Sequence, residues 1–242
     1  MKIKFFFVGL FLAVFFSSFV SCQSKKPDTP VAQDVVKDKQ DIKIIKIGDQ
    51  VWMAENMKVS EGRDGQKIEM IEMSLKNEKN EKSFDKLYSY HPNNDWNNDK
   101  SFGYLYNWAS ANIICPKGWH LPTEAEWKQL INYVSSQKEY VWGEDKNCIA
   151  QALASKDGWA DDPVAGNVGN DPGSNNATGF GALAAGYNHG YPLGFNQYGY
   201  YWTATQRDNS NACWVGFDYN KATVSFGDDY KDYGYSVRCV KD

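Results

Sequence analysis

The pattern of apolar and polar side chains is clearest in residues 115–134, where it predicts an amphipathic helix. Thr123 is followed three residues later by Glu126, the spacing of a capping box in which each side chain binds the other's backbone N–H group. Beyond this cap, apolar residues recur at helical spacing: Trp127, Leu130, Ile131 and Val134. The spacing places one apolar stripe on a helix that must be buried against other elements.

Two further segments have helical spacing, and the start of the domain alternates as a strand does. Residues 102–112 and 148–154 each place apolar side chains on one side of a short helix. Residues 42–53 alternate around a turn formed by Gly48 and Asp49, which is the pattern of a β-hairpin.

From residue 180 onward the apolar period becomes two, which predicts a series of short strands. The expected strands are residues 182–187, 200–205, 212–219, 222–226 and 235–240. Asn220 and Lys221 favour a hairpin turn between the third and the fourth of them. Cys239 shares a face of the last strand with Val237, so its side chain should point into the core. Helices followed by an antiparallel sheet make an α+β fold.

Two long segments are polar and rich in turn-forming residues. Residues 60–101 are interpreted as an insertion with short strands or turns, and residues 161–178 are too long for a simple connection, which makes them a candidate functional loop. The second segment carries oxygen ligands of the kind that calcium takes: Asp161, Asp162, Asn167, Asn170, Asp171, Asn175 and Asn176. Such loops are more often plain turns, so calcium is an alternative and no metal ligand is assigned.

The first residues have the pattern of a bacterial secretory signal. Lys2 and Lys4 form a charged start, and residues 3–16 are apolar but too few for a comfortable membrane span. We therefore predict a signal peptide over residues 1–21.

The end of this signal resembles the lipobox of bacterial lipoproteins. Ser21 stands directly before Cys22, although Phe19 replaces the usual leucine. The resemblance implies that Cys22 is acylated and becomes the new N-terminus, with an ordinary cleaved signal as the alternative. Residues 22–41 are rich in Lys, Asp, Pro and Gln, and we predict a disordered tether there.

The charge of the mature chain excludes one class of partner. Residues 1–21 hold two of the 26 basic side chains and none of the 30 acidic ones, so the mature chain carries a net charge of −6. Nucleic acid is therefore not expected as a partner. Aromatic residues make up 15% of the chain, and nine are Trp. They either fill a strand-rich core or form platforms for sugars or peptides.

Four cysteines remain beside Cys22, and in an oxidising compartment an even number predicts two disulfides. They are Cys115, Cys148, Cys213 and Cys239. Three connectivities are open from spacing alone. Zinc is not expected, because the chain has no CxxC motif and no paired histidines.

Six segments occur in the order found in one known family: IGDQVWMAENM from Ile47, FGYLYNWASA from Phe102, CPKGWHLPTEAEW from Cys115, GFGALAAGY from Gly179, GYYWTAT from Gly199 and YGYSVRCVKD from Tyr233. Together they resemble the Fibrobacter succinogenes major paralogous domain, over residues 42–242. The HLPTEAEW block is also similar to the formylglycine-generating enzyme group.

Both resemblances imply a C-type-lectin-like fold. Its features are two main helices, a twisted antiparallel sheet, terminal strands that pair with each other, and a long loop region. In that fold the first helix region lies beside the last strand, which implies a disulfide between Cys115 and Cys239. Cys148 is then left to pair with Cys213.

The chain departs from the active members of these groups. It does not clearly supply the cysteine pair with which formylglycine-generating enzymes bind copper. The segments Trp96-Asn97-Asn98-Asp99 and His91-Pro92-Asn93 look like lectin motifs but precede the helices, which is the wrong place. We therefore expect no enzyme, but an outer-membrane lipoprotein, on its periplasmic or surface-exposed side, that binds a glycan, a peptide or an envelope protein. The alternatives are an oxidase of the formylglycine-generating type and a structural component of a surface assembly.

The fold that the resemblance implies also suggests where a ligand binds. Four connections should converge at one end of the sheet: residues 157–178, 186–199, 206–211 and 227–234. Their aromatic residues, expected to bind the ligand, are Trp159, Tyr187, His189, Tyr191, Tyr198, Tyr230 and Tyr233, with orienting hydrogen bonds from Asn188, Arg207, Asp228 and Asp229. The alternative is that half of these rings only pack the loops together.

Overall fold

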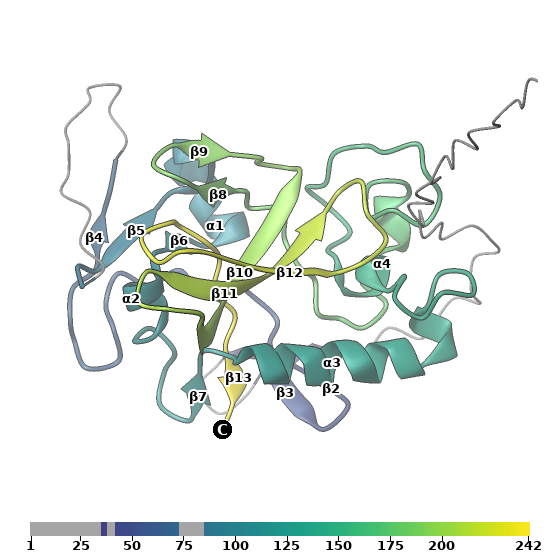
Figure 1. The fold of residues 1–242 in the computed structure, drawn as a ribbon, viewed down its shortest axis with the longest axis horizontal. Coiled ribbons are helices and arrows are strands. Elements are labelled where there is room, and N and C mark those ends of the chain that lie inside the picture. Colours follow the sequence, from purple (N-terminus) through teal and green to yellow (C-terminus); the bar gives the residue numbers. More distant parts are fainter. Residues whose placement is uncertain (1–34, 38–41, 73–84) are drawn as a thin grey trace, which may run out of the picture.

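The computed structural model describes residues 35–37, 42–72 and 85–242, with strands at the centre and helices around them (Figure 1). The expected signal peptide and lipidation at Cys22 lie outside the described residues. So does most of the tether, except that Val36 and Lys37 form a short strand paired with Ile44 and Lys43. For these two residues the prediction of disorder is wrong, because their backbone adds to the edge of the first hairpin.

The two ends of the domain meet in one five-stranded sheet. In sheet order its strands are β1 (Val36–Lys37), β2 (Lys43–Ile47), β3 (Gln50–Met53), β13 (Val240–Lys241) and β7 (Trp119–His120). The predicted hairpin of β2 and β3 is confirmed, and Gly48 takes the positive φ of 60° that its turn requires. The pairing of β13 with β3 confirms that the terminal strands lie together.

The central sheet is built from β10 (Tyr198–Gln206), β11 (Asn211–Asp218) and β12 (Ser225–Tyr230), all antiparallel. Alternation gives this sheet two faces. One face turns Tyr201, Val215 and Phe217, all fully buried, into the larger core. The strand predicted over residues 222–226 is displaced to β12, because the chain turns before it.

The long helix covers the core side of this sheet. Helix α3 (Glu124–Ser136) begins with the predicted capping box, in which Glu126 N–H donates to Thr123 Oγ1 at 3.2 Å and Thr123 N–H donates to Glu126 Oε2 at 2.8 Å. Trp127 is fully buried and packs against Trp52 at 4.8 Å between ring centroids. In Figure 1, α3 runs along the bottom of the molecule, below β10 to β12.

The remaining elements are short. They are β4 (Glu69–Met70), β5 (Tyr88–Tyr90), β6 (Leu105–Tyr106), β8 (Tyr187–Asn188), β9 (Pro192–Leu193), α1 (Asp99–Phe102), α2 (Trp108–Ala111) and α4 (Ala150–Leu153). Four 3-10 turns accompany them: Pro92–Asn94, Trp96–Asn98, Lys138–Tyr140 and Pro172–Ser174. The insertion predicted over residues 60–101 therefore has the expected short strands and turns where it is described.

Three predicted elements are wrong in detail. Of the strand expected over residues 235–240, only Val240 belongs to a strand, with single bridges at Tyr235 and Ser236. The helix expected over residues 102–112 is divided into the end of α1, strand β6 and helix α2, because Gly103 has a φ of 76° and the Asn107 side chain caps a new helix. The strand expected over residues 182–187 is mostly irregular, with single bridges at Ala182 and Gly186 before Tyr187 enters β8, since Gly186 also has a positive φ, of 70°.

One of the two expected disulfides is present as expected. Cys115 and Cys239 are bonded across 124 residues and are buried in the smaller core, which confirms this pair and the inward position of Cys239. The expected pair of Cys148 with Cys213 is wrong. Cys213 is a free, buried thiol in β11, where it faces Glu124 at the start of α3.

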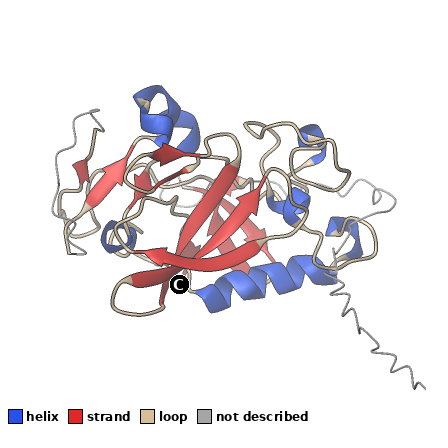
Figure 2. Cartoon of the chain, turned by 45° about the horizontal axis from the view of Figure 1, so that its top comes forward, coloured by secondary structure: helices blue, strands red, loops and turns tan. Residues whose placement is uncertain are grey.

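The architecture is α+β, as the sequence predicts. A long loop region from residue 155 to residue 186 holds one 3-10 turn, and Figure 2 shows loops gathered at one end of the strands. The expectation of two main helices is wrong for the described residues, among which α3 alone exceeds four residues. Within the same part of the chain, no helix is long and apolar enough to cross a membrane.

Candidate functional site

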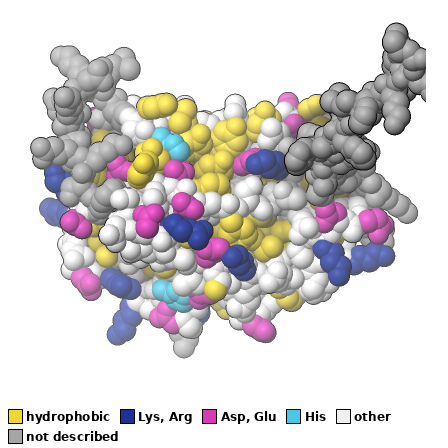
Figure 3. Space-filling model, viewed as in Figure 1, with side chains coloured by type: hydrophobic (Ala, Val, Ile, Leu, Met, Phe, Trp, Pro, Cys, Tyr) yellow, Lys and Arg dark blue, Asp and Glu magenta, His cyan; other side chains and the backbone are white. Residues whose placement is uncertain are grey.

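The second face of the central sheet carries aromatic rings instead of an aliphatic core. Tyr198 and Tyr200 of β10 and Trp214 of β11 are half-buried on this face. Along the edge of β10 away from β11, single bridges join this strand to two other segments, at Gly186 and Ser236, so the rings of these segments meet those of the strand. We call the resulting cluster the aromatic face: Tyr187, His189, Tyr198, Tyr200, Trp214, Tyr230 and Tyr233. In Figure 3, hydrophobic side chains form a band over β8, β9 and β10.

Glycines in neighbouring strands make room for these rings. Gly216 lies opposite Tyr200, and Gly227 lies opposite Trp214. A Cβ atom on Gly216 would come within 2.8 Å of the Tyr200 ring, and one on Gly227 within 2.3 Å of the Trp214 ring. The rings therefore lie flat across the sheet and stack on each other at 4.7 Å and 11°. The rings therefore present broad surfaces. These glycines serve to make room for side chains, whereas glycines elsewhere permit turns.

The stack continues into the loops. Tyr187 lies parallel to Tyr200, at 5.2 Å and 8°, and also contacts His189 at 4.5 Å. His189 stacks on Tyr233 at 3.8 Å, and Tyr230 meets Tyr233 edge-on at 5.6 Å. Rings from β8, β10, β11, β12 and the turn after β12 thus contribute to one surface.

Hydrogen bonds fix the histidine beneath this surface. His189 Nε2 lies 2.9 Å from the hydroxyl of Tyr235, which in turn donates to Asp229 Oδ2 at 2.7 Å. Tyr235 is fully buried. The hydrogen bonds that run from Asp229 through Tyr235 to His189 Nε2 orient the His189 ring for stacking.

The carboxylate of Asp218 lies close to the rings of the aromatic face. Burial raises the pKa of Tyr200 far above its usual range, and the charge of Asp218 raises it further, so the hydroxyl stays protonated. Asp218 is buried and pairs with Lys221 through Oδ2, while its Oδ1 has no hydrogen-bond partner within the described chain. Trp214 Nε1 likewise has no acceptor within these residues. Both atoms are buried, so they lie beneath the ring surface that a ligand would contact.

Most of the residues expected to bind a ligand do come together. Tyr187, His189, Tyr198, Tyr230 and Tyr233 all belong to the aromatic face. Tyr191 is 59% exposed at the tip of the β8–β9 hairpin, where its carbonyl accepts from His189 N–H at 3.1 Å. Of the orienting residues, Asn188 is buried and accepts a hydrogen bond from Gly190 N–H, and Asp229 binds Tyr235.

Three of the expected residues, Trp159, Arg207 and Asp228, lie elsewhere. Trp159 is a core residue, 7% exposed, whose Nε1 donates to Ser155 Oγ at 3.0 Å. Arg207 pairs with Asp228 at 3.2 Å on the opposite side of the sheet, because Asp228 shares a face with Phe226 under α3. None of these side chains belongs to the aromatic face.

Sequence reasoning missed two members of the face, Tyr200 and Trp214. The signal was present, because Tyr200 is two residues from Tyr198 and therefore on the same side of the strand. Glycine at positions 216 and 227 was read only as part of turns and strands. The register that places each glycine under a ring follows from the pairing of three strands, which a single segment does not specify.

In the polar loop of residues 161–178, side chains make hydrogen bonds to nearby protein groups. Asp162 Oδ1 accepts from Val164 N–H and from Asn167 Nδ2, both at 2.9 Å, and Asn175 Nδ2 donates to two backbone carbonyls. In the described part of the chain, no group of three or more His, Cys, Asp or Glu side chains could hold a metal ion. The loop thus uses its polar groups to support its own backbone.

Comparison with known proteins gives one match. The model of the Fibrobacter succinogenes major domain family matches residues 45–241. No curated protein and no solved structure matches the chain.

Proposed function

Since the chain belongs to the Fibrobacter succinogenes major domain family, we propose that it is a cell-envelope lipoprotein whose domain binds a glycan through the aromatic face. Anchoring by Cys22 at the outer membrane is part of the proposal. So is the C-type-lectin-like fold, which the paired terminal strands and the long loop region support. Function is argued from the site, because a fold of this kind serves several activities.

The stacked pair of Tyr200 and Trp214 carries the proposal. Flat aromatic rings on a sheet offer apolar surface to the C–H faces of sugar rings. The carboxylate of Asp229 lies on the same face of the sheet and is partly exposed, so it can accept hydrogen bonds from sugar hydroxyls. This combination of broad apolar surfaces and a few fixed acceptors is typical of sites that bind neutral saccharides.

An oxidase of the formylglycine-generating type is the less favoured candidate. That chemistry requires two free cysteines close together. Among the described residues Cys213 is the free thiol, and it is buried. Burial raises the pKa of this thiol, as does the nearby Glu124 carboxylate, which makes it a poor nucleophile and metal ligand.

A glycan array probed with the purified protein tests the proposal. Tyr191→Ala, Tyr198→Ala and Tyr230→Ala should each weaken binding of the best neutral oligosaccharide about threefold to tenfold, because a ring contact contributes about 0.5–1.5 kcal/mol. Melting temperatures should stay nearly unchanged for Tyr191 and Tyr230, which are 59% and 52% exposed.

Trp96→Ala is the matched control, since this ring is 71% exposed in a 3-10 turn outside the aromatic face. It should leave binding intact. The proposal would be refuted if the array showed no glycan, or if a peptide or an envelope protein were the ligand lost in these variants. A purely structural role would be indicated if the three tyrosine variants lost stability and no ligand bound.

A further inference from the structure

A cavity of about 560 Å³ lies between the segment after β3, helix α1 and the loop after α4. It is a polar cleft, unlike the aromatic face, with which it shares no lining residue. Four lysines line it: Lys43, Lys58, Lys100 and Lys156. The carboxylates in the lining are Glu55 and Asp157, so positive charge exceeds negative charge by two.

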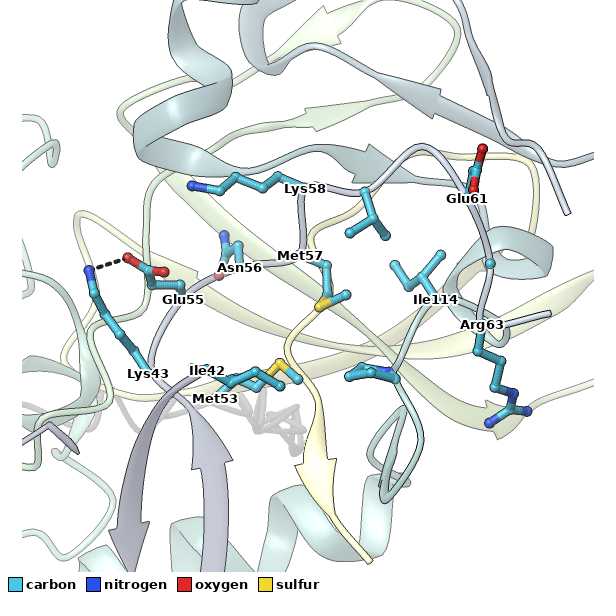
Figure 4. A pocket seen from close by; sticks show the side chains of 13 residues that line it. Ile42, Lys43, Met53, Glu55, Asn56, Met57, Lys58, Glu61, Arg63 and Ile114 are labelled. Carbon is cyan, nitrogen blue, oxygen red and sulfur yellow. Dashed lines mark hydrogen bonds and ion pairs between the residues drawn. The ribbon is translucent and has the colours of Figure 1, made fainter. Parts of the chain in front are cut away.

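The arrangement of these charges leaves cations available to a ligand. Lys43 Nζ pairs with Glu55 Oε1 at 2.7 Å. The ion pairs of the described chain do not include Lys58, Lys100 or Lys156. Figure 4 shows the charged ends of Lys43, Glu55 and Lys58 gathered on one side of this segment, away from Ile114.

A buried cation lies behind the cleft. Arg238 is fully buried and donates to Asn56 Oδ1 at 2.6 Å, to Gly181 O at 3.1 Å and to Phe180 O. These acceptors are neutral, and Asn56 and Gly181 both line the cleft. The charge of the guanidinium is therefore compensated by dipoles alone in these contacts, and its field adds to that of the lysines.

The cleft also holds a hydrogen-bond acceptor without a donor among the described residues, the side-chain oxygen of Asn176. Asn176 has a φ of 66°, and its Oδ1 is buried with no hydrogen-bond partner within the described chain. A simple anion such as phosphate offers lysines the charge they require, but the ionised groups have few hydrogens to donate. A sugar acid offers both, with a carboxylate for the lysines and hydroxyls for Asn176 and Asp157.

We propose that the cleft between Lys58, Lys100, Lys156 and Asn176 is a second binding site, which takes a carboxylate-bearing sugar of the uronic acid class. The site is independent of the aromatic face and of the neutral glycan proposed for it. The two sites can therefore bind separate ligands, and one oligosaccharide need not reach both.

The apolar groove beside the cleft does not compete for this role. It shares Lys43, Glu55, Asn56 and Lys58 with the cleft, but its lining also includes the apolar side chains of Met57 and Ile114. In Figure 4 these two apolar side chains lie on the far side from the charged ends of the lysines. Lys43, Lys58 and Arg63 line the groove as well, but most of its surface is apolar, so a carboxylate with its hydroxyl-bearing ring is better matched by the polar cleft.

Titration calorimetry with trigalacturonic acid tests the proposal, with neutral galactotriose and inorganic phosphate as comparison probes. The acid should bind with an affinity that falls as salt is raised, while galactotriose should not bind in the cleft. A double variant, Lys58→Ala with Lys156→Ala, should weaken binding of the acid at least about tenfold, the effect of losing two charge-assisted contacts. Its melting temperature should not change, since both side chains are exposed.

Lys46→Ala is the matched control, because this lysine is exposed on β2 and outside the cleft. Equal loss of binding in Lys46→Ala would show attraction by overall charge, and equal affinity for phosphate would show a general anion site. Either result overturns the proposal, as does absence of binding by the acid. Loss of acid binding in Tyr198→Ala but not in the lysine variant would also overturn it, and would leave the aromatic face as the single site. Failure of neutral glycans to bind, with the lysine result intact, would refute only the function proposed above.

Discussion

At the scale of single residues, His120 joins three parts of the chain that the sequence keeps apart. Its Nδ1 lies 2.7 Å from Asp242 Oδ1, and its Nε2 lies 2.7 Å from Glu126 Oε1. Glu126 is also the third residue of helix α3 and part of its capping box. One imidazole therefore links the final strand to the start of the helix, although the sequence indicates only that it precedes a helix cap.

These contacts predict a pH dependence of stability. Burial lowers the pKa of His120, but the hydrogen bonds to Asp242 and Glu126 outweigh it, so the pKa is raised above its ordinary 6.5. A raised pKa in the folded state stabilises the protein below about pH 6.5, and this contribution is lost as pH rises through the folded pKa. The advantage of the wild type over His120→Gln in urea unfolding should be about 0.5 kcal/mol larger at about pH 5.5 than at about pH 8, a small effect because solvent screens the half-exposed pair. An advantage that grew with pH would contradict this assignment.

Residue-scale prediction succeeded for exposed rings and failed where a side chain has a choice of partner. The aromatic residues of the loops could be recognised from composition, because rings flanked by glycine and polar residues have few ways to be buried. Arg207 could not be placed, since its position depends on which side of β12 Asp228 occupies. Trp159 was missed as a core residue because its loop folds back over the larger core.

At the scale of elements, the sequence predicts a helix or strand correctly when the residues that start and end it lie within the same segment. Helix α3 carries its cap and its apolar stripe within 13 residues, and it forms as expected. The segment at residues 102–112 also has helical spacing, but Gly103 approaches Met57 O so closely that a Cβ atom would lie 2.6 Å away. The contact is made with a distant segment, and tertiary packing overrides the helical preference.

The start of α3 can be tested directly. Thr123→Ala should lower the free energy of unfolding by about 1 kcal/mol, because Glu126 N–H loses its acceptor and the capping box is broken. Thr205 Oγ1 of β10 accepts from Glu124 N–H at 3.0 Å and should keep the first turn attached to the sheet. Chemical denaturation measures the change, with Thr223→Ala, in the turn before β12, as control. A loss equal to that of the control would mean that packing of Trp127 alone holds the helix start.

At the scale of the whole molecule, the fold class and the meeting of the two ends could be predicted, but not the full set of cysteine contacts. The family's order of segments places Cys115 beside the last strand, and the disulfide with Cys239 follows. The pairing of Cys148 with Cys213 was only what remained after that assignment. In the structure β11 lies between β10 and β12 and turns Cys213 toward the N-terminus of α3, which is the position of a structural thiol.

The anchoring of the molecule is the largest-scale prediction, and it rests on Cys22. The charged start, the apolar stretch and the Ser21–Cys22 junction predict acylation of this cysteine, so Cys22→Ala should move the protein from the membrane fraction to the soluble fraction. A fatty-acyl mass on the N-terminal peptide of the wild type is the second measurement. Trp96→Ala is the control for the fractionation, since it should remain with the membrane. Recovery of Cys22 in a disulfide-linked peptide would contradict the prediction, because acylation uses the same sulfur atom. A Cys22→Ala protein that stayed in the membrane fraction would show that the domain is held there by a binding partner instead.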